Sequence, residues 1–147
     1  PNLNLLKGNK VVCTKCNAVV SFMTVHCSEC NKCVLGYHYH CRWLNTCVGS
    51  TNYENYLYLI LGILLTSLLH LVVNISIVTA MFKNINTIMD AHKRLYGDAS
   101  VYATYMVFVW ITIIVTFVQF VAASYTFIYH LVYINKGMTR YEYQAIN

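Results

Sequence analysis

Charged side chains are missing from two long stretches of this 147-residue chain. Neither Tyr56 to Phe82 nor Tyr102 to Asn135 contains Asp, Glu, Lys or Arg. A helix that crosses a bilayer needs roughly 20 mostly apolar residues, and both stretches are longer than that. The absence argues against one large soluble core, although 58% of the residues are hydrophobic. It predicts two membrane-spanning helices, at residues 55–82 and 102–134.

Other residue types are absent or scarce as well. Ten Lys and Arg residues form no basic run and do not alternate with aromatic residues, so nucleic-acid binding is disfavoured. Only five Asp and Glu residues oppose them, and the net charge of +5 suits a face beside anionic lipid. Pro1 is not an initiator Met and no signal peptide precedes the cysteines, so we expect the C-terminal part of a longer protein.

The segments outside the predicted spans are short. Residues 1–10 are predicted to be a linker, 11–54 a cysteine-rich domain, 83–101 a non-cytosolic loop with a short amphipathic helix over 85–95, and 135–147 a tail. A domain as small as the cysteine-rich one buries too little apolar surface to fold alone. It therefore needs staples such as metal ions or disulfides.

The distribution of basic residues predicts the orientation in the membrane. Seven of the ten Lys and Arg residues lie before the first span or after the second, and three lie in the loop. The positive-inside rule then places the cysteine-rich domain and the tail in the cytosol. We expect the membrane itself to be an endomembrane (ER or Golgi) or the plasma membrane. Thiols stay reduced in the cytosol, so the cysteines are expected to bind metal.

All seven cysteines occur in one segment, together with three histidines: Cys13-x2-Cys16-x9-His26-Cys27-x2-Cys30-x2-Cys33-x4-His38-Tyr39-His40-Cys41-x5-Cys47. Tetrahedral zinc takes four Cys or His ligands, commonly from Cys-x2-Cys turns, here with short strands expected at 11–12 and 19–20. Two sites need eight ligands, and eight remain if Cys41 and His38 are left out. By spacing alone, Cys41 could instead be a ligand in place of His40. A RING-type double site fits poorly because it closes with Cys-x2-Cys.

A few polar residues lie within the predicted spans: His70, Asn74, Gln119, Ser124 and His130. Such residues usually face the interior of a helix bundle. A hydrogen bond between helices is the preferred prediction for them. A place along a substrate path is the alternative.

Residues 13–56 resemble the cysteine-rich domain of DHHC-type protein S-acyltransferases (palmitoyltransferases). The segment HCSECNKCVLGYHYHCRWLNTCVGSTNYENY keeps every cysteine spacing of the family pattern, which includes an Asp-His-His-Cys quartet and an Asn-Cys-Val-Gly motif. The tail sequence GMTRYEY resembles the family's Thr-Thr-x-Glu motif. The resemblance implies an α-helical integral membrane protein, with two helices of a bundle of four or more spans and a small zinc-stapled cytosolic domain.

The resemblance also implies roles for individual residues. It implies two interleaved structural zinc ions, one on Cys13, Cys16, His26 and Cys33, the other on Cys27, Cys30, His40 and Cys47. Cys41 would be the nucleophile, which takes an acyl chain from palmitoyl-CoA or another long-chain acyl-CoA and passes it to a cytosolic cysteine of a protein substrate. Supporting roles would fall to Trp43 and Tyr56 at the reactive centre and acyl cavity, and to Thr139 and Glu142 as braces of the domain.

The quartet here reads His38-Tyr39-His40-Cys41, where the family has Asp, which orients, and then His, which takes the cysteine proton. Tyrosine has a pKa of about 10 and imidazole titrates near 6.5, so His38 is the candidate base. We predict an S-acyltransferase that uses Cys41 with His38 or water. The alternatives are a degenerate family member that acts as a zinc-stapled membrane scaffold, and an unrelated zinc membrane protein such as a ligase or sensor. Asn52 is expected to cap the first span, because Asn is a good N-cap.

Overall fold

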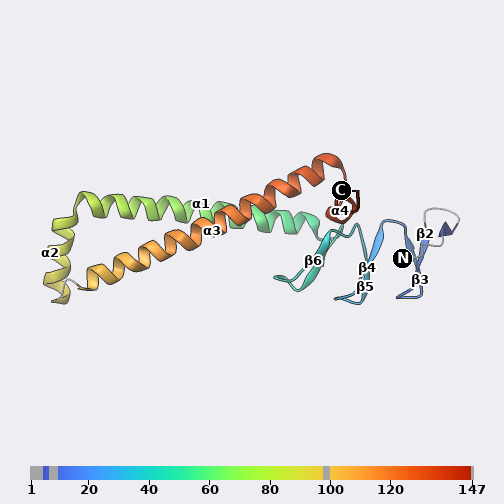
Figure 1. The fold of residues 1–147 in the computed structure, drawn as a ribbon, viewed down its shortest axis with the longest axis horizontal. Coiled ribbons are helices and arrows are strands. Elements are labelled where there is room, and N and C mark those ends of the chain that lie inside the picture. Colours follow the sequence, from blue (N-terminus) through green and yellow to red (C-terminus); the bar gives the residue numbers. More distant parts are fainter. Residues whose placement is uncertain (1–4, 7–9, 98–99, 147) are drawn as a thin grey trace. The chain divides into compact units, whose positions relative to one another are not determined.

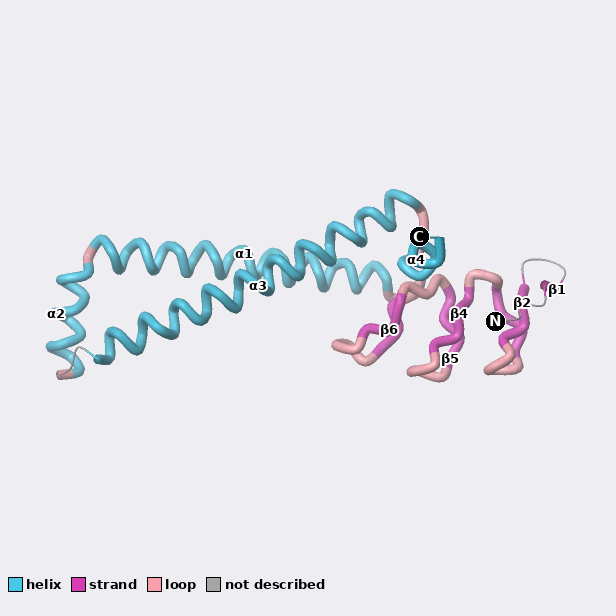
Figure 2. The backbone as a smooth tube through the Cα atoms, in the orientation of Figure 1, coloured by secondary structure: helices cyan, strands magenta, loops and turns pink. Residues whose placement is uncertain are grey.

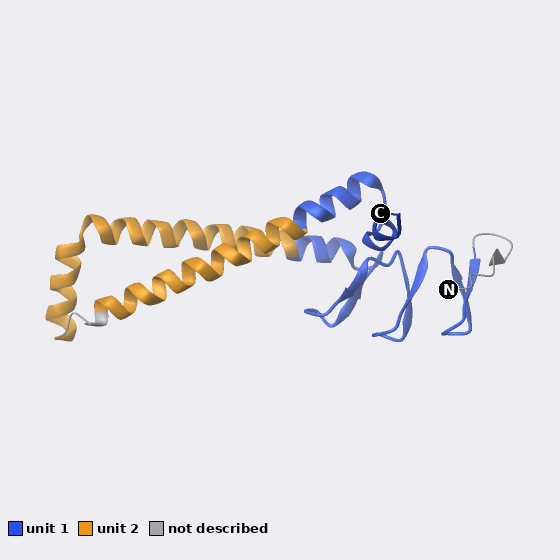
Figure 3. Ribbon diagram, viewed as in Figure 1, with its two compact units in different colours: residues 1–59, 127–147 blue, residues 60–126 orange. Residues whose placement is uncertain are grey.

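The structure, a computed structural model, describes residues 5–6, 10–97 and 100–146. Within this part, seven short strands precede four helices (Figures 1 and 2). The chain divides into two compact units (Figure 3). The first comprises Pro1–Leu59 and Phe127–Asn147, and the second Ile60–Thr126. The cysteine-rich segment and the tail therefore belong to the same unit.

Three antiparallel hairpins follow one another in the cysteine-rich segment (Figure 1). In the first, β2 (Lys10–Cys13) pairs with β3 (Ala18–Ser21), and β1 (Leu5–Leu6) adds to β2. The second pairs β4 (Thr24–Cys27) with β5 (Lys32–Leu35), and the third pairs β6 (Tyr39–Cys41) with β7 (Thr46–Val48). The short strands expected around the first turn lie within β2 and β3.

The same residue type ends the turn of each hairpin. Asn17, Asn31 and Asn45 have φ angles of 52°, 47° and 47°. Asparagine tolerates this left-handed conformation because its short polar side chain can bond to nearby backbone. These residues stand fourteen positions apart, as do Cys13, Cys27 and Cys41. The three hairpins therefore repeat one fourteen-residue unit, which was not predicted from the sequence.

Two long apolar helices run through the second unit. They are α1 (Tyr53–Lys83) and α3 (Ser100–Lys136), with the shorter α2 (Ile85–Tyr96) between them in sequence. Tyr53–Lys83 and Tyr102–Lys136 are long and apolar enough to cross a membrane, which agrees with the two predicted spans. The hydroxyl of Thr112 donates a 3.4 Å hydrogen bond to Asn74, an interhelical contact of the predicted kind. A bundle of four or more spans remains a prediction.

In the first unit, a glycine ends α3 and turns the chain into α4 (Arg140–Ile146). Gly137 has a φ of 63°, in the left-handed region that favours glycine. Its N–H donates to the carbonyl of Ile134 at 3.0 Å, and the N–H of Met138 donates to that of Tyr133 at 3.1 Å. This pair of bonds is the Schellman pattern of a helix end. It sets the start of α4 beside the third hairpin.

Candidate metal centres and reactive cysteine

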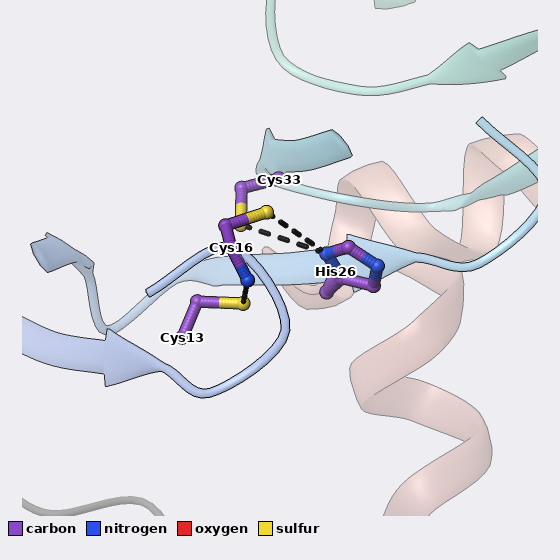
Figure 4. Close-up of side chains that lie close together, drawn as sticks. All are labelled: Cys13, Cys16, His26 and Cys33. Atoms are coloured by element: carbon purple, nitrogen blue, oxygen red, sulfur yellow. Dashed lines mark hydrogen bonds between the residues drawn. The ribbon is translucent and has the colours of Figure 1, made fainter. Parts of the chain in front are cut away.

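The first Cys/His group comprises Cys13, Cys16, His26 and Cys33, drawn in Figure 4. Their ligand atoms all lie within 4.8 Å of one another. The Nδ1 atom of His26 is 3.2 Å from the sulfur of Cys16 and 3.9 Å from that of Cys33. The Cys16 and Cys33 sulfurs are 3.4 Å apart. Three sulfurs and one imidazole nitrogen thus converge on one point.

The second group comprises Cys27, Cys30, His40 and Cys47. Here the Nδ1 atom of His40 is 3.2 Å from the sulfur of Cys30 and 3.8 Å from those of Cys27 and Cys47. The group contains His40 and leaves out Cys41, so it differs from the alternative set that spacing left open. Both groups have the membership that the resemblance implies.

The fourteen-residue repeat explains how the groups are built. Each takes two cysteines from the turn of one hairpin and a histidine and a cysteine from the strands of the next. In the third hairpin, the two turn positions hold Cys41 and Leu44. The second turn ligand is therefore replaced by leucine, and α1 follows where a fourth hairpin would supply the strand ligands. Cys41 occupies a ligand position of the repeat for which the other three ligands are absent.

The chemistry of the donors fits a metal ion. Burial, followed by the neighbouring cysteines, raises the pKa of Cys33 and of Cys47 from 9.0 to about 12. Thiolates packed this closely repel one another, and a divalent cation between them removes that penalty. Four ligands per group, all sulfur or imidazole nitrogen, are the set typical of structural zinc. The two groups could therefore hold two metal ions.

Cys41 is buried and has a different environment. Its side chain is 6% exposed, and in the third hairpin the residue pairs with Thr46. Tyr39 lies two residues earlier on the same strand, close enough for Cys41 to act electrostatically on its hydroxyl. All seven cysteines are free thiols, so no disulfide competes for Cys41.

His38 has partners of its own at the start of α4. Its Nδ1 accepts a 3.3 Å hydrogen bond from the backbone N–H of Arg140. Its ring stacks on that of Tyr53, with 4.1 Å between centroids. Burial lowers the pKa of His38 below its ordinary value, against the opposite effect of Glu142, so the imidazole is neutral near pH 7. These contacts hold the ring at α1 and α4, and its role as base to Cys41 remains a prediction.

Two partners hold the side chain of Tyr39. Its hydroxyl is hydrogen-bonded to the hydroxyl of Tyr56 at the start of α1. The guanidinium of Arg140 lies 4.6 Å from the centre of its ring, a cation–π contact. Burial, then the hydrogen bond to Tyr56, raises the pKa of Tyr39 above its ordinary value. Tyr39 therefore stays protonated and can donate a hydrogen bond but not accept a proton at neutral pH.

The comparison with protein families is decisive at this point. The family model for DHHC palmitoyltransferase matches residues 6–147. The chain belongs to the DHHC palmitoyltransferase family. The resemblance seen in the sequence is thereby confirmed. A search of curated proteins found no match to the chain.

The DHHC tail motif has a local structural role in this chain. Its Thr and Glu positions are Thr139 and Glu142, which form a capping box at the start of α4. The N–H of Thr139 donates to the Glu142 carboxylate at 2.7 Å, and the N–H of Glu142 donates to the Thr139 hydroxyl at 3.2 Å. Arg140 stands at the second Thr position of the motif, and its backbone N–H is the donor to His38. The capping box therefore fixes the position of the Arg140 N–H, which donates to His38 at the first position of the quartet.

His130 of α3 is the residue of this DHHC site that the sequence did not assign to it. Its side chain is 1% exposed, and its Nδ1 is 3.0 Å from the hydroxyl of Tyr53. Its ring centroid lies 5.2 Å from that of Tyr56 and 5.9 Å from that of His38. The sequence favoured an interhelical hydrogen bond for His130, which its contact with Tyr53 of α1 provides, and a place along a substrate path was the alternative. The available signal was an ionisable residue in an apolar span, which by itself does not say what lies opposite it.

Two further predicted residues lie at the edges of the site. Trp43 is 98% exposed at the tip of the third hairpin, away from protein contacts.

Asn52 directly precedes α1, but its side chain is hydrogen-bonded to backbone groups that precede it in the chain and does not cap the N–H groups of the helix. Its amide oxygen accepts from the N–H of Gly49 at 2.9 Å, and its amide nitrogen donates to the carbonyl of Cys47 at 2.9 Å. Asn52 thus ties the end of β7 to the start of α1.

Proposed function

We propose that the protein is a protein S-acyltransferase with Cys41 as its nucleophile. One observation carries the proposal: in a chain of this family, Cys41 is the single cysteine left outside the two ligand groups. The lone pair of a metal-bound thiolate is coordinated to the ion, which makes the sulfur a poor nucleophile, whereas the sulfur of Cys41 is free to form a thioester. The fourteen-residue repeat supports this choice, because Cys41 lacks the partners that a third site would need.

The metal ions of the two groups are zinc in this proposal, with structural roles. Zinc bound to three thiolates and one imidazole would join the first hairpin to the second and the second to the third. Each site would carry a net charge of about −1, which disfavours a thiolate nearby. Zinc would therefore hold Cys41 in place without activating it.

The reaction exchanges one thioester for another in two steps. The Cys41 sulfur attacks the carbonyl carbon of a long-chain acyl-CoA, the bond from that carbon to the CoA sulfur breaks, and CoA leaves with the proton of Cys41. A cysteine thiol of the protein substrate then attacks the acyl-Cys41 carbonyl, and its proton returns to Cys41. Bond types are conserved in each step, so catalysis depends on positioning and on proton handling.

The tyrosine at the second quartet position changes how the proton is handled. Tyr39 stays protonated, so it can donate a hydrogen bond to the oxygen that becomes negative in each transition state. The base remains His38 or water, as the sequence predicts. Loss of a positioned general base typically costs roughly 10²–10⁴-fold in rate, which leaves a slow enzyme.

The membrane places the substrates at the reactive cysteine. Tyr56, in the first turn of α1, is hydrogen-bonded to Tyr39, so in this proposal the reactive residue lies where α1 leaves the cysteine-rich domain. An acyl chain in the bilayer and a CoA head group in the cytosol would meet at this level. This arrangement fits a multi-pass protein with its cysteine-rich domain and tail in the cytosol, facing protein substrates there. Trp43, exposed at the hairpin tip, would contact lipid or the acyl chain.

A non-catalytic scaffold is the second candidate, and one observation favours it. The Nδ1 atom of His38 is engaged by Arg140, and Tyr39 occupies the position of the usual base. In a scaffold, the zinc-stapled hairpins and the neighbouring rings of Tyr39, Tyr53 and Tyr56 would serve only to hold a binding surface at the membrane.

A transfer assay separates the two functions. Purified full-length protein in nanodiscs is incubated with palmitoyl-CoA and a membrane-anchored peptide that carries one cysteine. The acyltransferase gives a hydroxylamine-sensitive acyl peptide with the parent protein and none above background with Cys41→Ser. Equal acylation by parent and variant, both with zinc bound, would rule out the enzyme and support the scaffold.

A further inference from the structure

Glu29, in the turn of the second hairpin, lies beside a metal-ligand histidine. Its Oε2 atom is 3.3 Å from the Nε2 atom of His40. The other ring nitrogen of His40, Nδ1, faces the three sulfurs of the second group. We propose that Glu29 is a positioning residue that orients His40 toward the second metal ion and thereby secures the strand that carries Cys41. The inference rests on the metal sites of the proposed function.

The proton positions on His40 follow from its two partners. Nδ1 can bind a metal ion only through a free lone pair, so the ring proton must be on Nε2. A carboxylate can only accept a hydrogen bond, so the Nε2–H of His40 donates to Glu29. Such carboxylate–histidine pairs fix the ring orientation and make the imidazole a better ligand. His40 is well placed for this effect because its side chain is only 7% exposed.

The two metal groups differ in this respect, although they come from one repeat. Fourteen residues before Glu29, the equivalent turn position of the first hairpin is Lys15. His26 is the counterpart of His40 and also turns its Nδ1 to the sulfurs. In the part of the chain that the structure describes, the contact of His40 with Glu29 is the only close one between a histidine or cationic nitrogen and a carboxylate oxygen. The second group therefore has a stabilising partner that the first lacks.

The second group is also the one attached to the nucleophile. His40 directly precedes Cys41 on β6, and across the hairpin His40 pairs with Cys47 while Cys41 pairs with Thr46. Two of the four ligands of this group thus lie on the hairpin that holds the reactive cysteine. Weaker binding of His40 to the metal ion would therefore make β6 more mobile at Cys41.

Timed alkylation of the zinc-loaded, full-length protein in nanodiscs tests the inference without any acyl transfer. A chelator and N-ethylmaleimide are added, and mass spectrometry follows the labelling of each cysteine. Glu29→Gln should speed the labelling of Cys27, Cys30 and Cys47 about tenfold. We expect this lower end of the range for such carboxylate partners because Glu29 is half exposed. Cys13, Cys16 and Cys33 should react as in the parent. Glu29→Ala should speed the labelling of Cys27, Cys30 and Cys47 more than Glu29→Gln does, because Gln keeps an acceptor oxygen.

Glu54→Gln is the matched control, because Glu54 is exposed in the first turn of α1 and outside both groups. Its labelling should equal that of the parent at all cysteines. The inference is overturned if Glu29→Gln leaves the three second-group cysteines unchanged, or if it speeds both groups equally. A parent protein that carries no zinc would overturn the metal sites themselves, and this inference with them.

Discussion

Restoring the family's Asp-His pair is the sharpest test of the proposal that proton handling limits the reaction of Cys41. The change is His38→Asp together with Tyr39→His. The structure can accept both, because the N–H of Arg140 already points at an acceptor at position 38 and would donate to a carboxylate equally well. At position 39, an imidazole would lie near Cys41, which already acts electrostatically on the Tyr39 side chain, and its unprotonated nitrogen could take the proton of the thiol.

The expected gain follows from the role of the base. A positioned general base contributes roughly 10²–10⁴-fold, so the double variant should form the acyl-enzyme faster by about that factor. This lowers the barrier by about 3–6 kcal/mol, at about 1.4 kcal/mol for each tenfold change. Tyr39→His alone should recover only part of it, because the imidazole would lack an orienting carboxylate. The two changes act as a unit and should not be additive.

Single-turnover kinetics with an alkyne-labelled palmitoyl-CoA give the acylation rate of each variant at neutral pH. Tyr39→Phe is the matched control, since it removes the hydroxyl and supplies no base. It should be slower than the parent if the Tyr39 hydroxyl stabilises the transition state. A double variant that folds, holds two zinc ions and is no faster than the parent would refute the reasoning.

Other predictions concern the domain that holds the reactive cysteine. Cys30→Ser should lose one of two zinc ions and unfold the hairpins, whereas Cys41→Ser should keep both, as measured by metal analysis and limited proteolysis. Chelation at neutral pH should make the hairpins sensitive to protease while the spanning helices keep their circular dichroism; a resistant domain would mean that metal is not its staple. Gly49→Ala should lower the free energy of unfolding by about 1–3 kcal/mol, because the new Cβ would come within 2.6 Å of Val34. Gly62→Ala, with nothing within 4 Å, should be tolerated, and equal effects of the two changes in denaturant melts would contradict this packing.

The helices and the ligand groups could be predicted because their signals are local. Apolar runs without charge identify spans by length alone, and α1 and α3 agree with that expectation. The resemblance to the DHHC family implied the two ligand sets, and the two groups in the structure have the same members. His40 illustrates the limit: spacing alone could not choose between it and Cys41, and the structure groups His40 with the three sulfurs.

Contacts between segments that lie far apart in the chain could not be predicted from the sequence. His130 is 91 residues from Tyr39 in the chain, and only the packing of α3 on α1 brings it to the rings of Tyr39 and Tyr53. Asn52 has the residue type of a helix cap, but two backbone groups at the end of β7 compete for its side chain. The fourteen-residue repeat was present in the sequence. It is hidden there because the first hairpin lacks the strand ligands and the third lacks one turn ligand.

The most direct test of the central claim is to locate the acyl group among the seven cysteines. The purified full-length protein is incubated with the alkyne-labelled palmitoyl-CoA, digested, and mapped by mass spectrometry with and without hydroxylamine. The account predicts a hydroxylamine-sensitive label on Cys41 alone, with all six cysteines of the two metal groups unlabelled. A label on the ligand cysteines, or no label on a protein that holds two zinc ions, would contradict it.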